Sequence, residues 1–117
     1  MQHLTNAITN LALLEATNAK QNHGTTYASH HEAYGVLAEE VQEAGEEHKS
    51  IQQHMEQLLR FLRTDYTEGI ADCLRVLKQD AIRAAAESVQ VAAVCNKWLD
   101  MMGGESNAWD IIPGQVD

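Results

Sequence analysis

Residues 67 to 102 decide the fold; they read TEGIADCLRVLKQDAIRAAAESVQVAAVCNKWLDMM. The stretch contains no proline, and its apolar residues recur every three or four positions, which is the period of an amphipathic helix. We expect one helix over about 68–101, ended by Gly103 and Gly104, because glycine readily closes a helix in the left-handed conformation. From Val89 onward apolar residues surround the helix axis, which favours burial against another subunit. The predicted apolar stripe is Ile70, Leu74, Leu77, Ala81, Ala84, Ser88, Val91, Cys95, Trp98 and Met102.

The preceding sequence predicts further helices. Residues 3–22 repeat apolar side chains at helical spacing, and Ser29-His30-His31-Glu32 is a capping-box pattern that starts another helix. The stripe predicted for that helix is Tyr34, Leu37, Ala38, Val41, Gly45 and His48. Helix continues or restarts over 51–63, and a turn at 64–67 offers Thr67 as an N-cap. We therefore predict an all-α antiparallel bundle of about four helices, forming one domain over 1–117 with a core at 29–102 and a tail at 103–117.

Composition narrows the function classes. Eight Lys and Arg oppose seventeen Asp and Glu, for a net charge of −9, so a nucleic-acid polymer is a poor partner. A hydrophobic content of 44% argues against a disordered acidic tail. The sequence starts without a basic, apolar leader and has no run long enough to cross a bilayer, so we expect a cytoplasmic protein without membrane contact. Cys73 and Cys95 are too isolated to indicate a disulfide or metal knuckle.

The densest chemical signal is LAEEVQEAGEE, residues 37–47. Glu40 and Glu43 are three residues apart, so both carboxylates project from one helical face beside apolar neighbours. Like charges held this close repel each other, and a divalent cation between them would relieve the repulsion. The alternative is a solvated acidic face without a ligand.

A second acidic position lies in AESVQVAA, residues 86–93. Glu87 stands among small and apolar residues, where a lone acid needs a partner. Arg83, one turn earlier, offers an intrahelical ion pair as the alternative to a metal. Asp80 is seven residues before Glu87, on roughly the same face, and could add another acid.

Together, the two elements resemble the MazG-like, all-α nucleoside triphosphate pyrophosphohydrolases over roughly residues 29–102. In that family an ExxE helix and an ExxD helix hold Mg²⁺, and the enzymes release a nucleoside monophosphate and pyrophosphate. Glu40 and Glu43 match the first pair, Glu87 matches the first acid of the second motif, and Gln90 stands where the family has aspartate. This second segment is similar to the ExVQVAA helix of a related MazG-like subgroup. The gap between Glu43 and Glu87 is longer than is usual in the family.

The resemblance implies a Mg²⁺-dependent nucleotide pyrophosphohydrolase that accepts Mn²⁺ as a substitute and assembles as a homodimer or homotetramer. Its implied metal ligands are Glu40, Glu43, Glu87 and Gln90. Glu39 and Glu43 are the candidate bases, because a carboxylate beside a metal-bound water can accept its proton. The competing class is a catalytically degenerate helical oligomer with a regulatory or interaction role, which the loss of one carboxylate at Gln90 favours.

Candidate substrate contacts lie on either side of the acids. His31 and Tyr34 precede them by one or two turns and could touch a base or ribose, although Tyr34 also fits a core position. Lys97 could approach a phosphate, with a surface role as the alternative. The six histidines form no HExxH pattern, so they give a structural zinc site little support.

Overall fold

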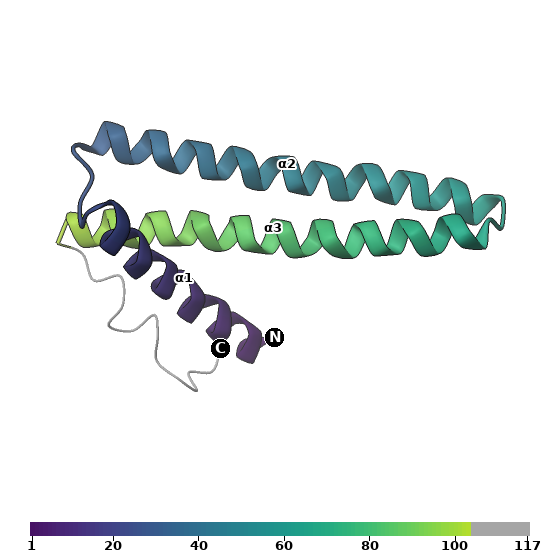
Figure 1. The fold of residues 1–117 in the computed structure, drawn as a ribbon, viewed down its shortest axis with the longest axis horizontal. Coiled ribbons are helices and arrows are strands. Elements are labelled where there is room, and N and C mark those ends of the chain that lie inside the picture. Colours follow the sequence, from purple (N-terminus) through teal and green to yellow (C-terminus); the bar gives the residue numbers. More distant parts are fainter. Residues whose placement is uncertain (104–117) are drawn as a thin grey trace. The chain divides into compact units, whose positions relative to one another are not determined.

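A computed structural model describes residues 1–103, and all the regular secondary structure in that range is helical (Figure 1). The helices are α1 (Gln2–His23), α2 (His30–Arg63) and α3 (Thr67–Met101). The prediction of an all-α fold is confirmed. The described part has three helices rather than about four, because α2 runs unbroken through Lys49 and Ser50, where the sequence contains neither glycine nor proline. Most of the predicted tail, 104–117, lies outside the described residues.

The ends of α2 and α3 follow local sequence signals. The Glu32 backbone N–H donates to Ser29 Oγ at 3.1 Å, so Ser29 caps the start of α2 as predicted. The return hydrogen bond differs from the predicted capping box, because the Glu32 carboxylate accepts the backbone N–H of Ala28, at 3.0 Å, rather than that of Ser29. Thr67 is the first helical residue of α3 rather than its N-cap. The Tyr66 carbonyl accepts the first helical hydrogen bond, from the Ile70 N–H at 3.0 Å.

The chain divides into two compact units, through both of which α2 and α3 pass. Among the described residues, unit 1 comprises 1–40 and 89–103, and unit 2 comprises 41–88. None of the three helices is long and apolar enough to cross a membrane.

Unit 2 is an antiparallel hairpin of α2 and α3. Ala44 on α2 and Cys73 and Ala84 on α3 are buried along its seam. At the closed end, the rings of Phe61 and Tyr66 meet edge to face, with centroids 5.4 Å apart. Both rings press on Gly69, where an added Cβ would come within 2.6 Å of Tyr66 Cδ2.

In unit 1, α1 packs with the last turns of α3. Ala12 and Ala16 of α1 are buried, as are Ala93 and Val94 of α3. Lys20 of α1 forms an ion pair with Asp100 of α3. The Trp98 indole N–H lies 2.8 Å from His30 Nδ1, which ties α3 to the first turn of α2.

The buried face of α3 agrees with the predicted stripe at six positions and differs at four. The less exposed side chains recur at 73, 77, 80, 84, 87, 91, 94 and 98. The predicted Ile70, Leu77, Ala84, Val91, Cys95 and Trp98 are all buried or half-buried. Leu74, Ala81, Ser88 and Met102 are exposed instead. Cys73, Asp80 and Glu87 take the inner positions between the correctly predicted ones in unit 2.

A similar shift corrects the stripe predicted for α2. Ala33 and Ala44 are buried and Leu37 and Glu40 half-buried. Among the predicted stripe residues, Tyr34 is 66% exposed and Val41 52% exposed, so Tyr34 is not a core residue. Large apolar side chains therefore remain on the outer face of α2.

Candidate functional site

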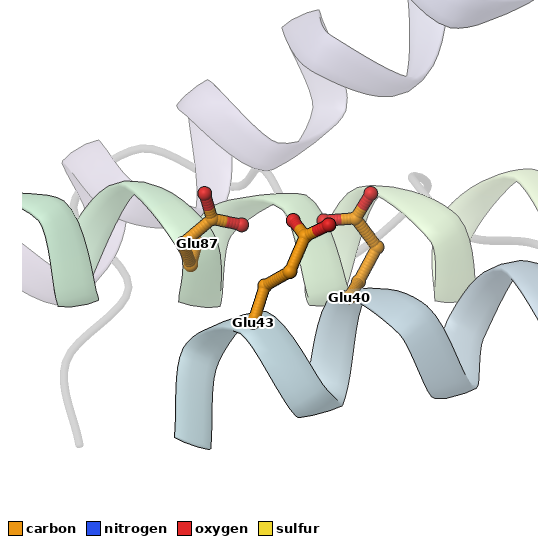
Figure 2. A group of neighbouring side chains, drawn as sticks. All are labelled: Glu40, Glu43 and Glu87. Carbon is orange, nitrogen blue, oxygen red and sulfur yellow. The ribbon is translucent and has the colours of Figure 1, made fainter. Parts of the chain in front are cut away.

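Three carboxylates from two helices converge in the structure. Glu40 and Glu43 rise from α2 and Glu87 from α3, and their side chains point toward one another (Figure 2). One carboxylate oxygen from each lies within 4.8 Å of the others. Glu40 and Glu87 are half-buried and Glu43 is exposed. We call these three residues the acidic cluster.

Helical periodicity explains which face of each helix carries these residues, and the packing of α3 against α2 brings the faces together. Glu40 occupies a position between Ala33 and Ala44 on the less exposed face of α2, and Glu87 lies one turn beyond Ala84 on the corresponding face of α3. Glu43 stands three residues after Glu40, so it projects from a neighbouring position on the same helix. Two sequence motifs 44 positions apart thus supply one group of oxygen ligands.

Arg83 does not form the intrahelical pair with Glu87 that the sequence offered as an alternative. Its guanidinium binds the Asp80 carboxylate at 2.7 Å and the Glu47 carboxylate at 3.2 Å. Within the described residues, Glu87 is therefore placed with the acids of α2 rather than with the nearest cation of its own helix.

Asp80 belongs to a separate polar network in unit 2. Its carboxylate is only 1% exposed and accepts a hydrogen bond from Ser50 Oγ at 2.9 Å. His54 Nδ1 lies 2.7 Å from the same carboxylate oxygen, while Arg83 binds the other. Burial alone would raise the pKa of the Asp80 carboxyl, but the hydrogen bonds from Ser50, His54 and Arg83 outweigh burial and hold that pKa below its usual value. Asp80 thus stabilises the hairpin rather than adding an acid to the cluster.

Unit 1 contains a cavity of about 450 Å³, which we call the unit 1 cavity. All three helices and the loop between α1 and α2 contribute to its wall. Its lining residues are Glu15, Asn18, Ala19, Asn22, His23, Thr26, Tyr27, Glu32, Val36, Glu40, Gln90, Val94 and Lys97. Glu40 therefore belongs both to this wall and to the acidic cluster.

Gln90 lines the unit 1 cavity and also contacts α1. Its side-chain amide donates a hydrogen bond to the Glu15 carboxylate at 3.2 Å. The position that carries aspartate in the resembled family here holds a neutral amide next to a carboxylate from another helix. Glu15 thereby places a negative charge at the cavity wall beside residue 90.

Lys97 is the buried cation of the unit 1 cavity. The residue is only 4% exposed, and its ammonium lies 4.3 Å from the centroid of the Tyr27 ring. Burial raises the pKa of the Tyr27 hydroxyl, as do the nearby Cys95 thiol and the carboxylates of Glu32 and Glu40. Tyr27 therefore stays neutral and presents its ring face to the lysine.

The other predicted site residues lie elsewhere. Glu39, His31 and Tyr34 are all exposed on α2, and none lines the unit 1 cavity or joins the acidic cluster. Sequence reasoning missed Tyr27 and Glu15 as lining residues. Glu15 did leave a signal, since it stands at a three-to-four spacing from Leu11 in an otherwise apolar pattern. Tyr27 left none, because it lies in a loop without periodicity.

The acidic cluster brings three carboxylates together, and Lys97 adds a buried ammonium to the wall of the unit 1 cavity, which also includes Glu40. Carboxylates are preferred ligands of Mg²⁺ and Mn²⁺, and an ammonium binds phosphate as a point charge. No protein-family model, curated protein or solved structure matches this chain.

Proposed function

We propose that the chain is a Mg²⁺-dependent nucleotide pyrophosphohydrolase that converts a nucleoside triphosphate to the monophosphate and pyrophosphate. The observation that carries this proposal is the convergence of Glu40, Glu43 and Glu87, because two remote motifs supply three carboxylates to one point. The second support is the adjoining unit 1 cavity, whose wall includes Glu40.

The donor set fits a hard divalent cation. All three ligands are carboxylates, and oxygens bound to one Mg²⁺ lie about 3–4 Å apart, so separations of up to 4.8 Å need only small side-chain rotations. Mg²⁺ held by these residues would neutralise phosphate charge and lower the pKa of a bound water. An acidic chain with a net charge of −9 needs such a cation to hold a triphosphate.

The proposed roles follow from placement on α2 and α3. Glu40, Glu43 and Glu87 would hold the cation, and Glu43, the most exposed of the three, would accept a proton from the attacking water. Gln90 contributes an amide oxygen or orients Glu15 through its hydrogen bond.

We further propose a homodimer or homotetramer. The observation that supports assembly is the set of large apolar side chains left uncovered on both helices of unit 2: Val41, Met55, Leu59, Leu62, Leu74 and Ile82. One hairpin seam cannot bury both stripes of each helix, so a second copy would cover the outer ones.

The test is release of pyrophosphate from each nucleoside triphosphate in the presence of Mg²⁺. Glu40→Ala, Glu43→Ala and Glu87→Ala should each lower kcat/KM by about 10²-fold or more, the loss expected when a group that acts on transition-state charge is removed. Glu56→Ala, which removes an exposed acid from α2 outside the acidic cluster, serves as the control. Equal activity in all four variants would overturn the site assignment.

The second candidate function is a catalytically degenerate oligomer of the same fold, favoured by the neutral amide of Gln90. Gln90→Asp separates the two candidates, because it restores a fourth acid. If the wild type neither binds metal nor releases pyrophosphate while Gln90→Asp binds metal, the degenerate function is correct.

A further inference from the structure

We propose that the unit 1 cavity is a phosphoryl-binding pocket in which Lys97 Nζ holds the phosphate of a nucleotide or of pyrophosphate. In naming this ligand class the inference rests on the proposed function, but the pocket can bind phosphate whether or not the chain hydrolyses a triphosphate. The residues that build the pocket come mainly from α1, the following loop and α3.

The first observation is a buried ammonium for which residues 1–103 supply no anionic partner. Lys97 is only 4% exposed, yet within residues 1–103 its Nζ forms neither an ion pair nor a hydrogen bond. Its one described interaction is the contact with the Tyr27 ring face, 4.3 Å from the centroid. A buried ammonium is energetically unfavourable unless it is paired with an anion. We therefore expect Lys97 to bind an anion that residues 1–103 do not supply.

Tyr27 holds the ammonium without using its hydrogen-bond donors. A cation–π contact stabilises the charge through the ring face, and the three N–H groups stay available to a ligand. Because burial raises the pKa of the Tyr27 hydroxyl, the ring does not acquire a negative charge that would compete for Lys97.

The carboxylates in the cavity wall make contacts other than ion pairs with Lys97, so the ammonium remains available to a ligand. Glu32 accepts the Ala28 backbone N–H at the start of α2, and Glu15 accepts the Gln90 amide. Glu40 belongs to the acidic cluster. The cavity therefore presents a cation on one wall and a proposed cation-binding carboxylate on another, a combination that suits a phosphate bound together with Mg²⁺.

The surrounding groups suit the rest of such a ligand. Asn18, Asn22 and Thr26 offer neutral hydrogen-bond donors, and Val36 and Val94 offer apolar contact. A volume of about 450 Å³ falls within the range of small-molecule sites in proteins.

The experiment is isothermal titration calorimetry of the full chain with three probes: pyrophosphate, AMP and adenosine, each in EDTA and again with MgCl2, at matched ionic strength. Wild type should bind the phosphate-bearing probes and not adenosine. Lys97→Met, which keeps much of the side-chain length without the charge, should weaken binding by about ten-fold or more, the loss of one charged hydrogen bond. Lys78→Met removes the same charge from an exposed position of α3 and should leave binding unchanged.

Each outcome decides the inference. Binding of pyrophosphate alone identifies an inorganic ligand, and binding of AMP as well identifies a nucleotide; both support the pocket. Equal effects of Lys97→Met and Lys78→Met, or no binding of either phosphate in EDTA or MgCl2, overturn it. Thermal unfolding of each variant verifies folding, and Lys97→Arg, which retains a cation, supplies a second comparison if Lys97→Met does not fold.

Failure of the pocket and failure of the proposed function are distinguishable. Glu87→Gln alters the acidic cluster but none of the cavity-lining residues, so phosphate binding in EDTA should persist in that variant. Lys97-dependent binding in a wild type that releases no pyrophosphate keeps the pocket and rejects the hydrolase. If the wild type releases pyrophosphate but Lys97→Met does not weaken phosphate binding, the hydrolase is kept and the pocket is rejected.

Discussion

Replacing Glu87 with glutamine tests the acidic cluster through stability alone, with no knowledge of the substrate. Glu87 takes part in two of the three close carboxylate pairs, whose oxygens are at most 4.8 Å apart. Two unit charges at that separation repel by about 0.9 kcal/mol in water and by about 3.5 kcal/mol at an effective dielectric of 20. Because Glu43 is exposed and the other two are half-buried, the value for water is the better guide.

Removing the Glu87 charge from both pairs should therefore raise the free energy of unfolding by about 1–2 kcal/mol in EDTA. For a chain of this length, 1 kcal/mol corresponds to about 3–6 °C in Tm. When Mg²⁺ is added, the wild type should become the more stable of the two proteins. Mg²⁺ at a hundred times its Kd stabilises the wild type by about 2.7 kcal/mol, whereas the variant has lost one of the side chains that bind the ion.

The assay is thermal unfolding by circular dichroism in EDTA and across a MgCl2 series, with KCl held constant to fix the screening. Glu56→Gln is the matched control, since it removes the same charge from an exposed position outside the cluster. If Glu87→Gln and Glu56→Gln have the same Tm in EDTA and the same response to Mg²⁺, the reasoning about the cluster is refuted.

Three further predictions address the fold. Gly69→Ala should be destabilised, because overpacking against Phe61 and Tyr66 costs about 1–3 kcal/mol, whereas the higher helix propensity of alanine contributes only about 1 kcal/mol. Gly35→Ala, whose new methyl group meets open space on α2, should instead be stabilised by about 0.5–1 kcal/mol. Urea unfolding of both variants measures the difference. Asp80→Asn should make the free energy of unfolding less dependent on pH in acid. The pKa of the Asp80 carboxyl is lowered in the native state, so its contribution to stability is present above the unfolded pKa of about 3.9 and is lost as pH falls through the native pKa. Acid titration of the two proteins by circular dichroism measures this difference. The wild type should elute as a dimer or tetramer in size-exclusion chromatography with light scattering, and Ile82→Glu should reduce its mass to that of the 13.0 kDa chain; a folded wild-type monomer at micromolar concentration would contradict the proposed assembly.

Local sequence signals determined the helices and most of their ends. Ser29 and Glu32 fixed the start of α2 through hydrogen bonds between residues at most four apart. Gly103, with a φ of 77°, lies in the left-handed conformation expected of a residue that ends a helix. The spacing of Glu40 and Glu43 likewise follows from one helix, so their shared face was predictable without knowledge of the fold.

Only the tertiary structure decided which of two overlapping stripes is buried. Leu77 and Ala84 belong to both, but hydrophobicity alone favoured Leu74 as their neighbour, whereas the hairpin turns Asp80 inward and leaves Leu74 52% exposed. Asp80 tolerates burial because Ser50 and His54, from the other helix, bind one of its carboxylate oxygens and Arg83 binds the other. Sequence spacing contains no information about the pairing with α2.

The meeting of Glu87 with Glu40 and Glu43 was implied by the family resemblance, but local spacing alone could not decide it. Local spacing allowed Glu87 to pair with Arg83 or to approach Glu43. In the structure Arg83 instead pairs with Asp80 of its own helix and with Glu47 of α2. Lys97 likewise gave no sign in the sequence that it would lie against Tyr27, 70 positions earlier, because a cation–π contact depends on how a loop folds over a helix. Helix formation depends on residues three or four positions apart, so the sequence alone predicts it. Burial and the geometry of the candidate site depend on contacts between segments that are distant in the chain.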